Sequence, residues 1–416
     1  MKKSGFWFAV FTLVFVLSFS YVCTEFIIPF FKGHYTYSAT QCLTDDITAD
    51  MDAYAIADKY SEAGAITRIA ISYSLTEVSW GSGVCIASNG YKTTSLENEY
   101  TASKGSYFAT NYHVIDKVAT SSGFSISVEV EKKDENGDLT YPSYSGKLLW
   151  YNKDLDVAIV YTEQNFGYVS MRDNWIDYDS TGRHRESVFV MGTPVDTQNR
   201  NRVTTGGIGS ISGLHANTLT TVSGKNVVNN YYEDVIDLTA DISSGNSGGG
   251  VFDSKGRLIG LSTLGITYED GGVTAFNGAT AIYPVMKALD KVIVNNETSE
   301  EHKVYDLEKL GIKGYDGNEA NAIKLYSNYL DGNYYTSVSF NDYGYYVESS
   351  SIGLSKVAIK KVKLERGEEV VDEVEILDRN DLIYILLKAN AGDVLTVTFP
   401  SGTLFGGTIT KAITLS

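Results

Sequence analysis

The sequence predicts a mainly β chain with an N-terminal transmembrane helix and a small C-terminal α+β domain. An uninterrupted apolar run follows two lysines near the N-terminus. From about residue 66 to 282, short β-branched runs alternate with Gly, Asn, Ser and Asp clusters, which is typical of sandwiches and barrels. The last hundred residues mix helix-like and strand-like stretches. We expect four parts, at residues 1–32, 33–65, 66–298 and 299–416.

Composition and charge exclude several classes of protein. The chain has 416 residues, 43% of them hydrophobic and 20% charged, which excludes wholesale disorder. Its net charge of −17 argues against nucleic acid as a partner. Cys23, Cys42 and Cys85 are too few for a disulfide scaffold. A Cys42–Cys85 disulfide and two free thiols both remain open.

The N-terminal apolar run, residues 6–22, would span about 26 Å as a helix, against about 30 Å for a bilayer core. Lys2 and Lys3 precede it and predict a cytoplasmic N-terminus. The run is longer than the apolar region of a cleaved signal, and Ser18 and Ser20 offer only a poor cleavage site. We therefore expect a retained signal-anchor, with a cleaved signal peptide as the alternative. Either interpretation places the rest of the chain outside the cytoplasm, and the anchor makes it a single-pass protein of the cell membrane.

Helices are expected on either side of the β-rich region. Residues 43–63 predict a helix with Met51, Tyr54, Ala55 and Tyr60 on roughly one face. Pro284 suits the first turn of a second helix, before a polar linker at 295–303. Beyond the linker we expect a helix at 318–330 and strands within 333–376. A last helix follows Asp378, before a Gly-Asp turn and a strand, VLTVTF.

Three fragments carry residues suited to acyl transfer. They are YFATNYHVID with His113, KDLDVAIVYT with Asp156, and DISSGNSGGGVFD with Ser247. A serine nucleophile needs a base within hydrogen-bond reach, and the base needs a carboxylate that holds its tautomer. Backbone N–H groups must also face the developing oxyanion. We expect an oxyanion hole at Gly245, Asn246 and Ser247, with Gly245 and Ser247 as the two donors.

These fragments resemble the trypsin-like serine peptidases, and most closely their HtrA (Deg) branch. TNYHVID, DVAIV and SSGNSGG match the family's histidine, aspartate and serine motifs in order and approximate spacing, and the resemblance covers roughly residues 66–294. It implies two six-stranded β-barrels with the triad between them. Ser247 would be the nucleophile, His113 the general acid and base, and Asp156 the orienting carboxylate, with Asp154 and Asp116 as rivals for the acidic role.

The resemblance also suggests substrate-binding residues. Thr263, Leu264 and Gly265 lie in a strand like the one that pairs with the substrate main chain. Asp241 occupies the place of trypsin's specificity carboxylate, which would favour Lys or Arg at the cut site, but HtrA-like pockets differ. Asn246 stands where secreted digestive relatives have an aspartate that pairs with a newly cut N-terminus, which argues against activation by that route.

HtrA relatives commonly carry PDZ domains after the peptidase. The stretch ILDRNDLIYILLKANAGDVLTVTF resembles the latter half of such a domain, and residues 344–347 could form its carboxylate-binding loop. A PDZ domain captures a C-terminal peptide by strand addition. The alternative is a structural β-rich module without a ligand.

The sequence therefore predicts a membrane-anchored bacterial serine endopeptidase that acts on misfolded, unfolded or membrane proteins, and by resemblance a homotrimer. A non-catalytic chaperone or stress sensor is the alternative, and a processing protease with one regulatory substrate is a third possibility. We expect no cofactor, and HExxH and CxxC motifs are absent from the sequence, so a metal site is unsupported.

Overall fold

The structure is a computed structural model, and it describes residues 42–74, 76–153, 155–172, 186–194, 204–213, 218–222, 225–229, 235–266, 276–305, 312–315, 344–347, 357–375, 379–400 and 407–416. All described residues lie in one compact unit, Thr40–Ser416. The apolar run at 6–22 and the helix expected at 318–330 lie outside the described residues. Within the described ranges, every helix is too short or too polar to cross a bilayer.

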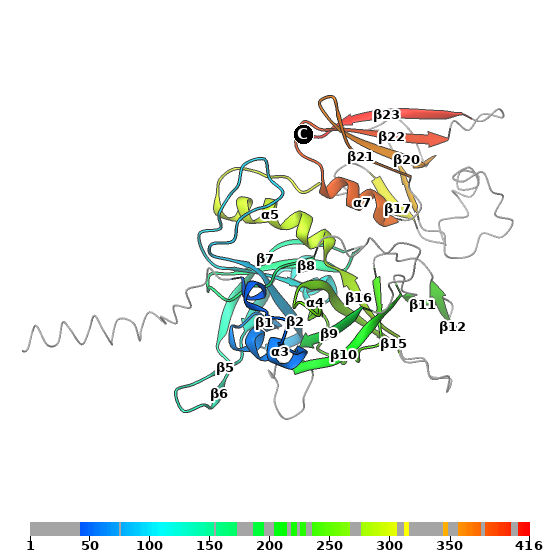
Figure 1. The fold of residues 1–416 in the computed structure, drawn as a ribbon. Coiled ribbons are helices and arrows are strands. Elements are labelled where there is room, and N and C mark those ends of the chain that lie inside the picture. Colours follow the sequence, from blue (N-terminus) through cyan, green and yellow to red (C-terminus); the bar gives the residue numbers. More distant parts are fainter. Residues whose placement is uncertain are drawn as a thin grey trace, which may run out of the picture. The chain divides into compact units, whose positions relative to one another are not determined.

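The first barrel is a closed antiparallel sheet with strand order β1-β2-β3-β8-β7-β4 (Figure 1). Its strands are β1 (Ile66–Tyr73), β2 (Thr76–Ser88), β3 (Ser106–Thr110), β4 (Phe124–Glu129), β7 (Ser143–Asn152) and β8 (Val157–Thr162). Every residue of β3 and β8 is buried, because other elements cover these strands from outside the barrel. A short ribbon, β5 (Lys132–Lys133) with β6 (Leu139–Thr140), extends the connection between β4 and β7.

The second barrel is also closed, with strand order β10-β13-β16-β15-β14-β9. Its strands are β9 (Ser187–Gly192), β10 (Thr204–Gly213), β13 (Val235–Leu238), β14 (Gly250–Asp253), β15 (Leu258–Ile266) and β16 (Phe276–Ala281). A separate ribbon pairs β11 (Thr218–Val222) with β12 (Lys225–Asn229). The two six-stranded barrels agree with the fold that the sequence predicts for this region.

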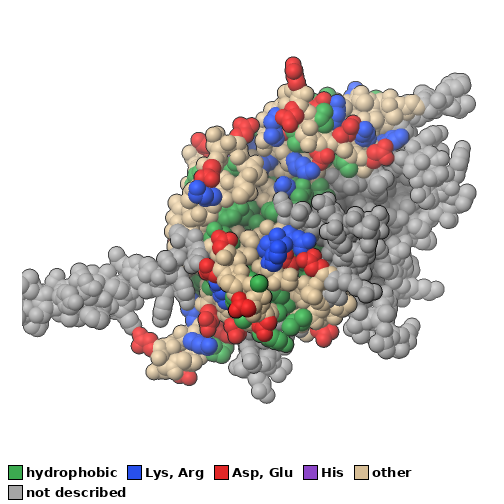
Figure 2. All heavy atoms as spheres, viewed as in Figure 1, with side chains coloured by type: hydrophobic (Ala, Val, Ile, Leu, Met, Phe, Trp, Pro, Cys, Tyr) green, Lys and Arg blue, Asp and Glu red, His purple; other side chains and the backbone are tan. Residues whose placement is uncertain are grey.

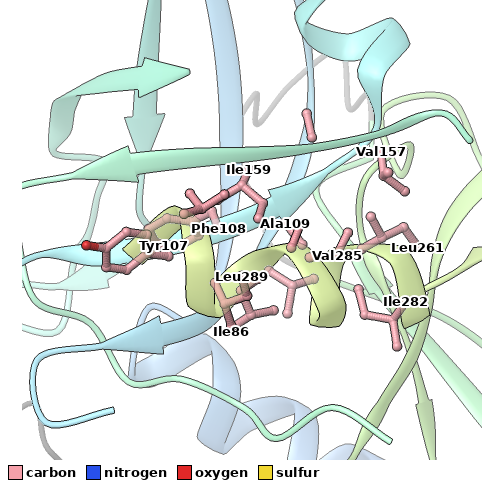
Figure 3. Packing of buried hydrophobic residues seen from close by; sticks show 14 of the residues in the cluster. Ile86, Tyr107, Phe108, Ala109, Val157, Ile159, Leu261, Ile282, Val285 and Leu289 are labelled. Atoms are coloured by element: carbon pink, nitrogen blue, oxygen red, sulfur yellow. The ribbon is translucent and has the colours of Figure 1, made fainter. Parts of the chain in front are cut away.

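Helix α5 (Tyr283–Glu297) follows the second barrel and packs against the first. Pro284 lies in its first turn, as the sequence predicts, but the helix extends into the expected linker. Figure 3 shows Val285 and Leu289 of α5 packed among side chains of the first barrel, including Ile86 and Phe108. This shared apolar core joins the first barrel to α5.

The segment before the first barrel contains a 3₁₀ helix (Leu43–Asp46) and helix α3 (Ala53–Glu62) instead of one continuous helix. Tyr60 is fully buried, and its hydroxyl donates to the Gly256 carbonyl at 2.6 Å. Its ring lies 5.4 Å from that of Phe252 in β14. Tyr54, expected on the same face, is 62% exposed. The helix begins only at Ala53, with Asp52 as its N-cap, and Ile56, Ala57 and Tyr60 are the residues it buries.

The C-terminal module contains two sheets and helix α7. One sheet is β17 (Ile312–Tyr315), β18 (Gly344–Val347) and β19 (Val357–Ala358). The other has the order β21-β20-β22-β23, from β20 (Lys361–Arg366), β21 (Glu369–Glu375), β22 (Val394–Pro400) and β23 (Thr408–Thr414). Helix α7 (Arg379–Leu387) shares the buried apolar cluster of β20 and β22. It contacts α5 through the ring pair of Tyr283 and Tyr384, whose centroids are 5.3 Å apart.

The C-terminal interpretation needs one correction. Residues 344–347 form strand β18, which pairs with β17 on one side and β19 on the other. All four residues pair with β17, and Tyr346 and Val347 also pair with β19, so this segment is a strand and not a carboxylate-binding loop. The loop was expected from the resemblance to PDZ domains, whereas the Tyr-Tyr-Val that follows Gly344 favours a strand.

Cys42 and Cys85 are free thiols, which decides between the two possibilities left open by the sequence. Cys85 is fully buried in β2, and burial raises the pKa of its thiol. On the face seen in Figure 2, acidic and basic side chains are interspersed.

Candidate active site

His113 lies in the first turn of helix α4 (Tyr112–Thr120), directly after the buried strand β3. Asn111 precedes the helix in an extended conformation, and its Nδ2 donates to the Asp156 carbonyl at 2.8 Å. This bond ties the start of α4 to the start of β8. The His113 side chain is 47% exposed, so its ring is accessible from solvent.

Asp156 bonds the histidine through both carboxylate oxygens. Oδ2 lies 2.8 Å from His113 Nδ1, and Oδ1 accepts from the His113 backbone N–H at 2.9 Å. The backbone of Asp156 has φ of 52°, in the left-handed region that aspartate tolerates better than most residues. The tight β7–β8 connection therefore turns this carboxylate back toward α4.

Of the two rival carboxylates, only Asp116 lies among the described residues. Asp116 lies one turn further along α4 and makes no hydrogen bond to the ring. Asp154 lies outside the described residues. Asp156 is thus the carboxylate that the structure brings to His113.

The pKa of His113 reflects opposing effects. Burial disfavours the charged ring, but the hydrogen bond and charge of Asp156, with the charge of Asp116, raise the pKa of His113 above its ordinary value. Asp156 has the larger effect of the two carboxylates on the pKa of His113, because it bonds the ring directly.

Ser247 lies in the loop between β13 and β14, and β2 of the first barrel holds this loop. The Ser82 backbone N–H donates to the Ser247 carbonyl at 2.7 Å. The Ser82 hydroxyl donates to the Gly245 carbonyl at 2.7 Å and accepts from the Thr193 N–H at 2.8 Å. One residue of β2 therefore joins the serine loop to the end of β9, and it connects the two barrels at the site.

The residue after Ser247 packs directly against the start of α4. A Cβ on Gly248 would lie 2.4 Å from Thr110 Oγ1 and 3.1 Å from the Asn111 backbone nitrogen, and Gly248 has φ of +83°. Only glycine fits there, on steric and conformational grounds. The serine loop and the histidine helix are thus in close contact. The Ser247 hydroxyl and the His113 ring make no direct hydrogen bond in this part of the chain.

The loop before Ser247 contains a β-turn from Ser243 to Asn246, closed by the Asn246 N–H donating to the Ser243 carbonyl at 3.0 Å. Gly245 has φ of +91°, which identifies a type II turn. The Asn246 N–H is used in the turn, which agrees with the expectation that the donors are its two neighbours, with Asn246 between them. The Gly245 and Ser247 N–H groups make no hydrogen bond to any described residue, and they stay the two candidates.

The Asn246 side chain is only 1% exposed, and neither of its amide atoms has a hydrogen-bond partner among the described residues. A Cβ on Gly192 would lie 2.7 Å from its Oδ1, so Gly192 makes room for this amide.

The residues expected to bind substrate have different places in the structure. The Thr263 hydroxyl donates to Asp156 Oδ2 at 2.6 Å. Leu264 and Gly265 pair with β16 on one side, whereas pairing of β15 with β14 ends at Leu261. This part of β15 therefore has an edge that no described strand uses. Asp241 is exposed, before the serine loop.

Sequence reasoning missed Ser82 and Thr193, and it gave Thr263 a main-chain role without its bond to Asp156. A signal for Ser82 was present, because Gly81 and Gly83 flank it in a strand and glycine inside a strand marks close backbone approach. A Cβ on Gly81 would lie 2.8 Å from the Ser247 carbonyl oxygen. Among the residues that the structure describes, no group of His, Cys, Asp and Glu is arranged to hold a metal ion.

Comparisons with known proteins bear on this constellation. The family model described as a trypsin-like peptidase domain matches residues 81–261. Protease Do-like 5, chloroplastic, of Arabidopsis thaliana is 31% identical over 216 residues, which is 50% of this chain and 62% of that protein. Serine protease Do-like HtrA of Lactobacillus helveticus is 26% identical over 312 residues, which is 71% of this chain and 65% of that protein.

The solved structure titled "Crystal structure of Deg5" is 24% identical and covers 59% of this chain and 98% of its own, with a TM-score of 0.38. The fold assignment rests on the strand topology of this chain itself. The chain spans less than two thirds of the length of the two curated relatives.

Two closed barrels, a His–Asp pair and a glycine-rich serine loop define a trypsin-like peptidase domain, in agreement with the family match. Within that class, the chain is similar to the Do-like and HtrA serine proteases among its curated relatives.

Proposed function

We propose that this chain is a serine endopeptidase that hydrolyses peptide bonds through an acyl-enzyme on Ser247. The observation that carries the proposal is the bond between His113 Nδ1 and Asp156 Oδ2. His113 lies at the start of a helix, and the residues just before that helix pack against the serine loop. A histidine held in this way keeps its proton on Nδ1. Its Nε2 is then free to accept a proton from an alcohol.

Each residue has a defined part in the reaction. The Ser247 Oγ attacks the scissile carbonyl carbon while its proton moves to Nε2 of His113. Asp156 stabilises the imidazolium that forms. The C–N bond then breaks, and the proton passes from Nε2 to the leaving amine. Water then attacks the acyl carbon while its proton moves to the same nitrogen. The ester bond to Ser247 Oγ breaks, the proton passes from Nε2 to Oγ, and the second product leaves.

The oxyanion would be bound by the N–H groups of Gly245 and Ser247. Both lack a hydrogen-bond partner among the described residues, and the type II turn at Gly245 determines how the peptide before it is oriented. Donors of this kind stabilise the negative charge that develops on the carbonyl oxygen.

Substrate would bind as an extended strand on the unpaired edge of β15, at Leu264 and Gly265. Strand addition supplies main-chain hydrogen bonds regardless of sequence, so it suits unfolded segments of many proteins. We therefore propose misfolded or regulatory proteins as substrates. Asp241 is proposed to favour Lys or Arg at the cut site. A peptide library tests this proposal, and a preference for small apolar residues there would exclude it.

The surroundings of the peptidase are also part of the proposal. The apolar run at 6–22 supports a membrane anchor with the peptidase outside the cytoplasm. A homotrimer is proposed from the resemblance to HtrA proteins. Fractionation with alkaline extraction would test the anchor, and sedimentation of the purified chain would test the trimer.

The C-terminal module is proposed to be PDZ-like and to capture a C-terminal peptide by strand addition. Strand β17 lies at the end of its sheet, so one of its edges is free of any described strand. Titration with C-terminal hydrophobic peptides tests this proposal. Absence of binding at millimolar concentration would favour a structural module without a ligand.

A fluorophosphonate probe, which reacts with activated serines, tests the central proposal. We expect a single modified peptide containing Ser247, with labelling lost in Ser247→Ala. Ser244→Ala is the matched control, because Ser244 is an exposed serine of the same loop and should leave labelling intact. Labelling that survives in Ser247→Ala would contradict the proposal.

Casein cleavage separates the enzyme from the alternative of a chaperone or stress sensor. We expect Ser247→Ala to abolish cleavage and Ser244→Ala to retain it. Suppression of casein aggregation without cleavage by the unaltered protein would instead favour the chaperone.

A further inference from the structure

A cavity of about 750 Å³ lies between the first barrel, helix α5 and the C-terminal module. Residues 147–150 of β7 form one wall, and residues 292, 295 and 296 of α5 form another. The remaining walls are residues 301–305 and residues 413–416. Cavities of this volume are typical of small-molecule sites. None of the three proposed catalytic residues lines this cavity, so it is separate from the candidate active site.

The wall formed by β7 is apolar. Leu148, Leu149 and Trp150 are consecutive in the strand, and each of them is only half-buried. Side chains of a regular strand alternate between its two faces, but a bulge between Leu148 and Trp150 interrupts the pattern here. Buried Val292 and Leu415 border the cavity from α5 and the C-terminal module. A ligand that covered this wall would remove apolar surface from water, which favours binding.

Several polar groups around the cavity already bind one another. The Asn295 side chain accepts from the His302 backbone N–H and donates to the His302 carbonyl. Lys303 Nζ donates to the Ser416 carbonyl at 2.6 Å. A polypeptide in the cavity would bring backbone N–H and C=O groups, and burying such groups without partners is costly. The cavity therefore suits an aliphatic chain better than a peptide.

Lys147 supplies a positive charge beside the apolar wall. Its side chain is exposed, and its ammonium donates to the Asn296 side-chain oxygen at 3.2 Å. An ammonium has three donors, so Lys147 can also bind an anion. Glu301 is the one acidic side chain among the described residues that line the cavity. Lys147 and Lys303 outnumber it, although the whole chain has a net charge of −17.

We propose that this cavity binds a long-chain carboxylate, of which dodecanoate is an example. The aliphatic chain would cover Leu148, Leu149 and Trp150, and the carboxylate would accept a charge-assisted hydrogen bond from Lys147. The site is independent of the proposed peptidase function, because no proposed catalytic residue borders it. Since the first barrel, α5 and the C-terminal module all contribute walls, a bound ligand would stabilise the folded chain.

Tryptophan fluorescence tests where the ligand binds. The probe is 12-bromododecanoate, whose bromine quenches the emission of a tryptophan that it contacts. We expect saturable quenching in the unaltered full-length chain and loss of most of it in Trp150→Phe. Trp80→Phe is the matched control, because Trp80 lies outside the cavity, with its ring 4.9 Å from the Arg68 guanidinium. Absence of saturable quenching, or an equal loss in both variants, would overturn the site.

Calorimetric titration with dodecanoate tests the function assigned to Lys147. We expect Lys147→Met and Lys147→Glu to raise the Kd at least about tenfold, because the hydrogen bond to a charged group is lost. Lys133→Glu is the matched control: it changes an exposed lysine of the β5–β6 ribbon, which does not line the cavity, and should leave the Kd unchanged. Dodecanol, which lacks the charge, should bind the unaltered chain at least about tenfold more weakly than dodecanoate.

Three results would overturn the proposed ligand class. They are an unchanged Kd in both Lys147 variants, equal binding of dodecanol and dodecanoate, and displacement of dodecanoate by an apolar peptide that binds more tightly. Thermal unfolding without ligand shows whether the Lys147 variants are folded. We expect their Tm to equal that of the unaltered chain, because Lys147 is exposed and its bond to Asn296 is exposed too. Dodecanoate should raise the Tm of the unaltered chain more than that of either Lys147 variant.

Discussion

Replacing Asp156 with asparagine tests the function assigned to the carboxylate. Asparagine has nearly the same size and tolerates the left-handed backbone at this position, where φ is 52°. In the folded protein, Oδ2 of Asp156 is within hydrogen-bond distance of both His113 Nδ1 and the Thr263 hydroxyl, at 2.8 and 2.6 Å. An amide has only one oxygen, so Asp156→Asn cannot accept all three hydrogen bonds that the carboxylate receives.

The expected loss follows from the tautomer of His113. If the amide nitrogen faces the ring, it donates to Nδ1 and places the ring proton on Nε2, where it blocks proton transfer from Ser247. An aspartate-to-asparagine change in such a triad costs about 10⁴-fold in kcat. This corresponds to about 5.4 kcal/mol of transition-state stabilisation, at about 1.36 kcal/mol for each factor of ten.

The assay is kcat for a fluorogenic peptide, measured beside thermal unfolding to show that the variant is folded. Asp116→Asn is the matched control, since it removes a charge that acts on His113 without removing a bond to the ring. We expect it to change kcat by less than about tenfold at neutral pH. A folded Asp156→Asn protein with kcat within tenfold of the unaltered protein would refute the reasoning.

Three further outcomes are expected. Because the pKa of His113 is raised and the neutral ring is the base, kcat/KM should fall with acidification at a midpoint above pH 6.5. Asp116→Asn should move that midpoint to lower pH. A shift to higher pH would count against Asp116 as one cause of the raised pKa. Gly245→Ala should reduce kcat by about 10²-fold, because φ of +91° is strained for alanine. If the turn loses this φ value, the peptide before residue 245 rotates and its N–H no longer faces the oxyanion. Unchanged labelling by the fluorophosphonate probe would disprove this. Leu289→Ala should lower the free energy of unfolding in urea by about 2–5 kcal/mol, because Leu289 of α5 is fully buried against the first barrel. Lys287→Ala should change this free energy by about 0.5 kcal/mol or less. Equal effects of the two substitutions would contradict the packing argument.

Local signals in the sequence were sufficient to predict several of the elements. The β-branched run at 66–74 corresponds to strand β1, and Pro284 marks the start of α5 within one residue. Both signals depend on neighbouring residues, through strand propensity and the fixed φ of proline. The buried face of helix α3 was harder to predict, because it is set by tertiary contacts such as those of Tyr60 with Gly256 and Phe252, and Tyr54 is exposed.

The candidate site shows the same division between local and long-range information. The sequence alone determined which residue types could perform acyl transfer and in which segments they lie, since His113, Asp156 and Ser247 each belong to a recognisable local motif. Only the tertiary structure decided which atoms meet: Thr263 bonds Asp156 across 107 residues, and Ser82 bonds Gly245 across 163. Such contacts are created when two barrels pack together, and no periodicity or propensity within a short segment contains that information.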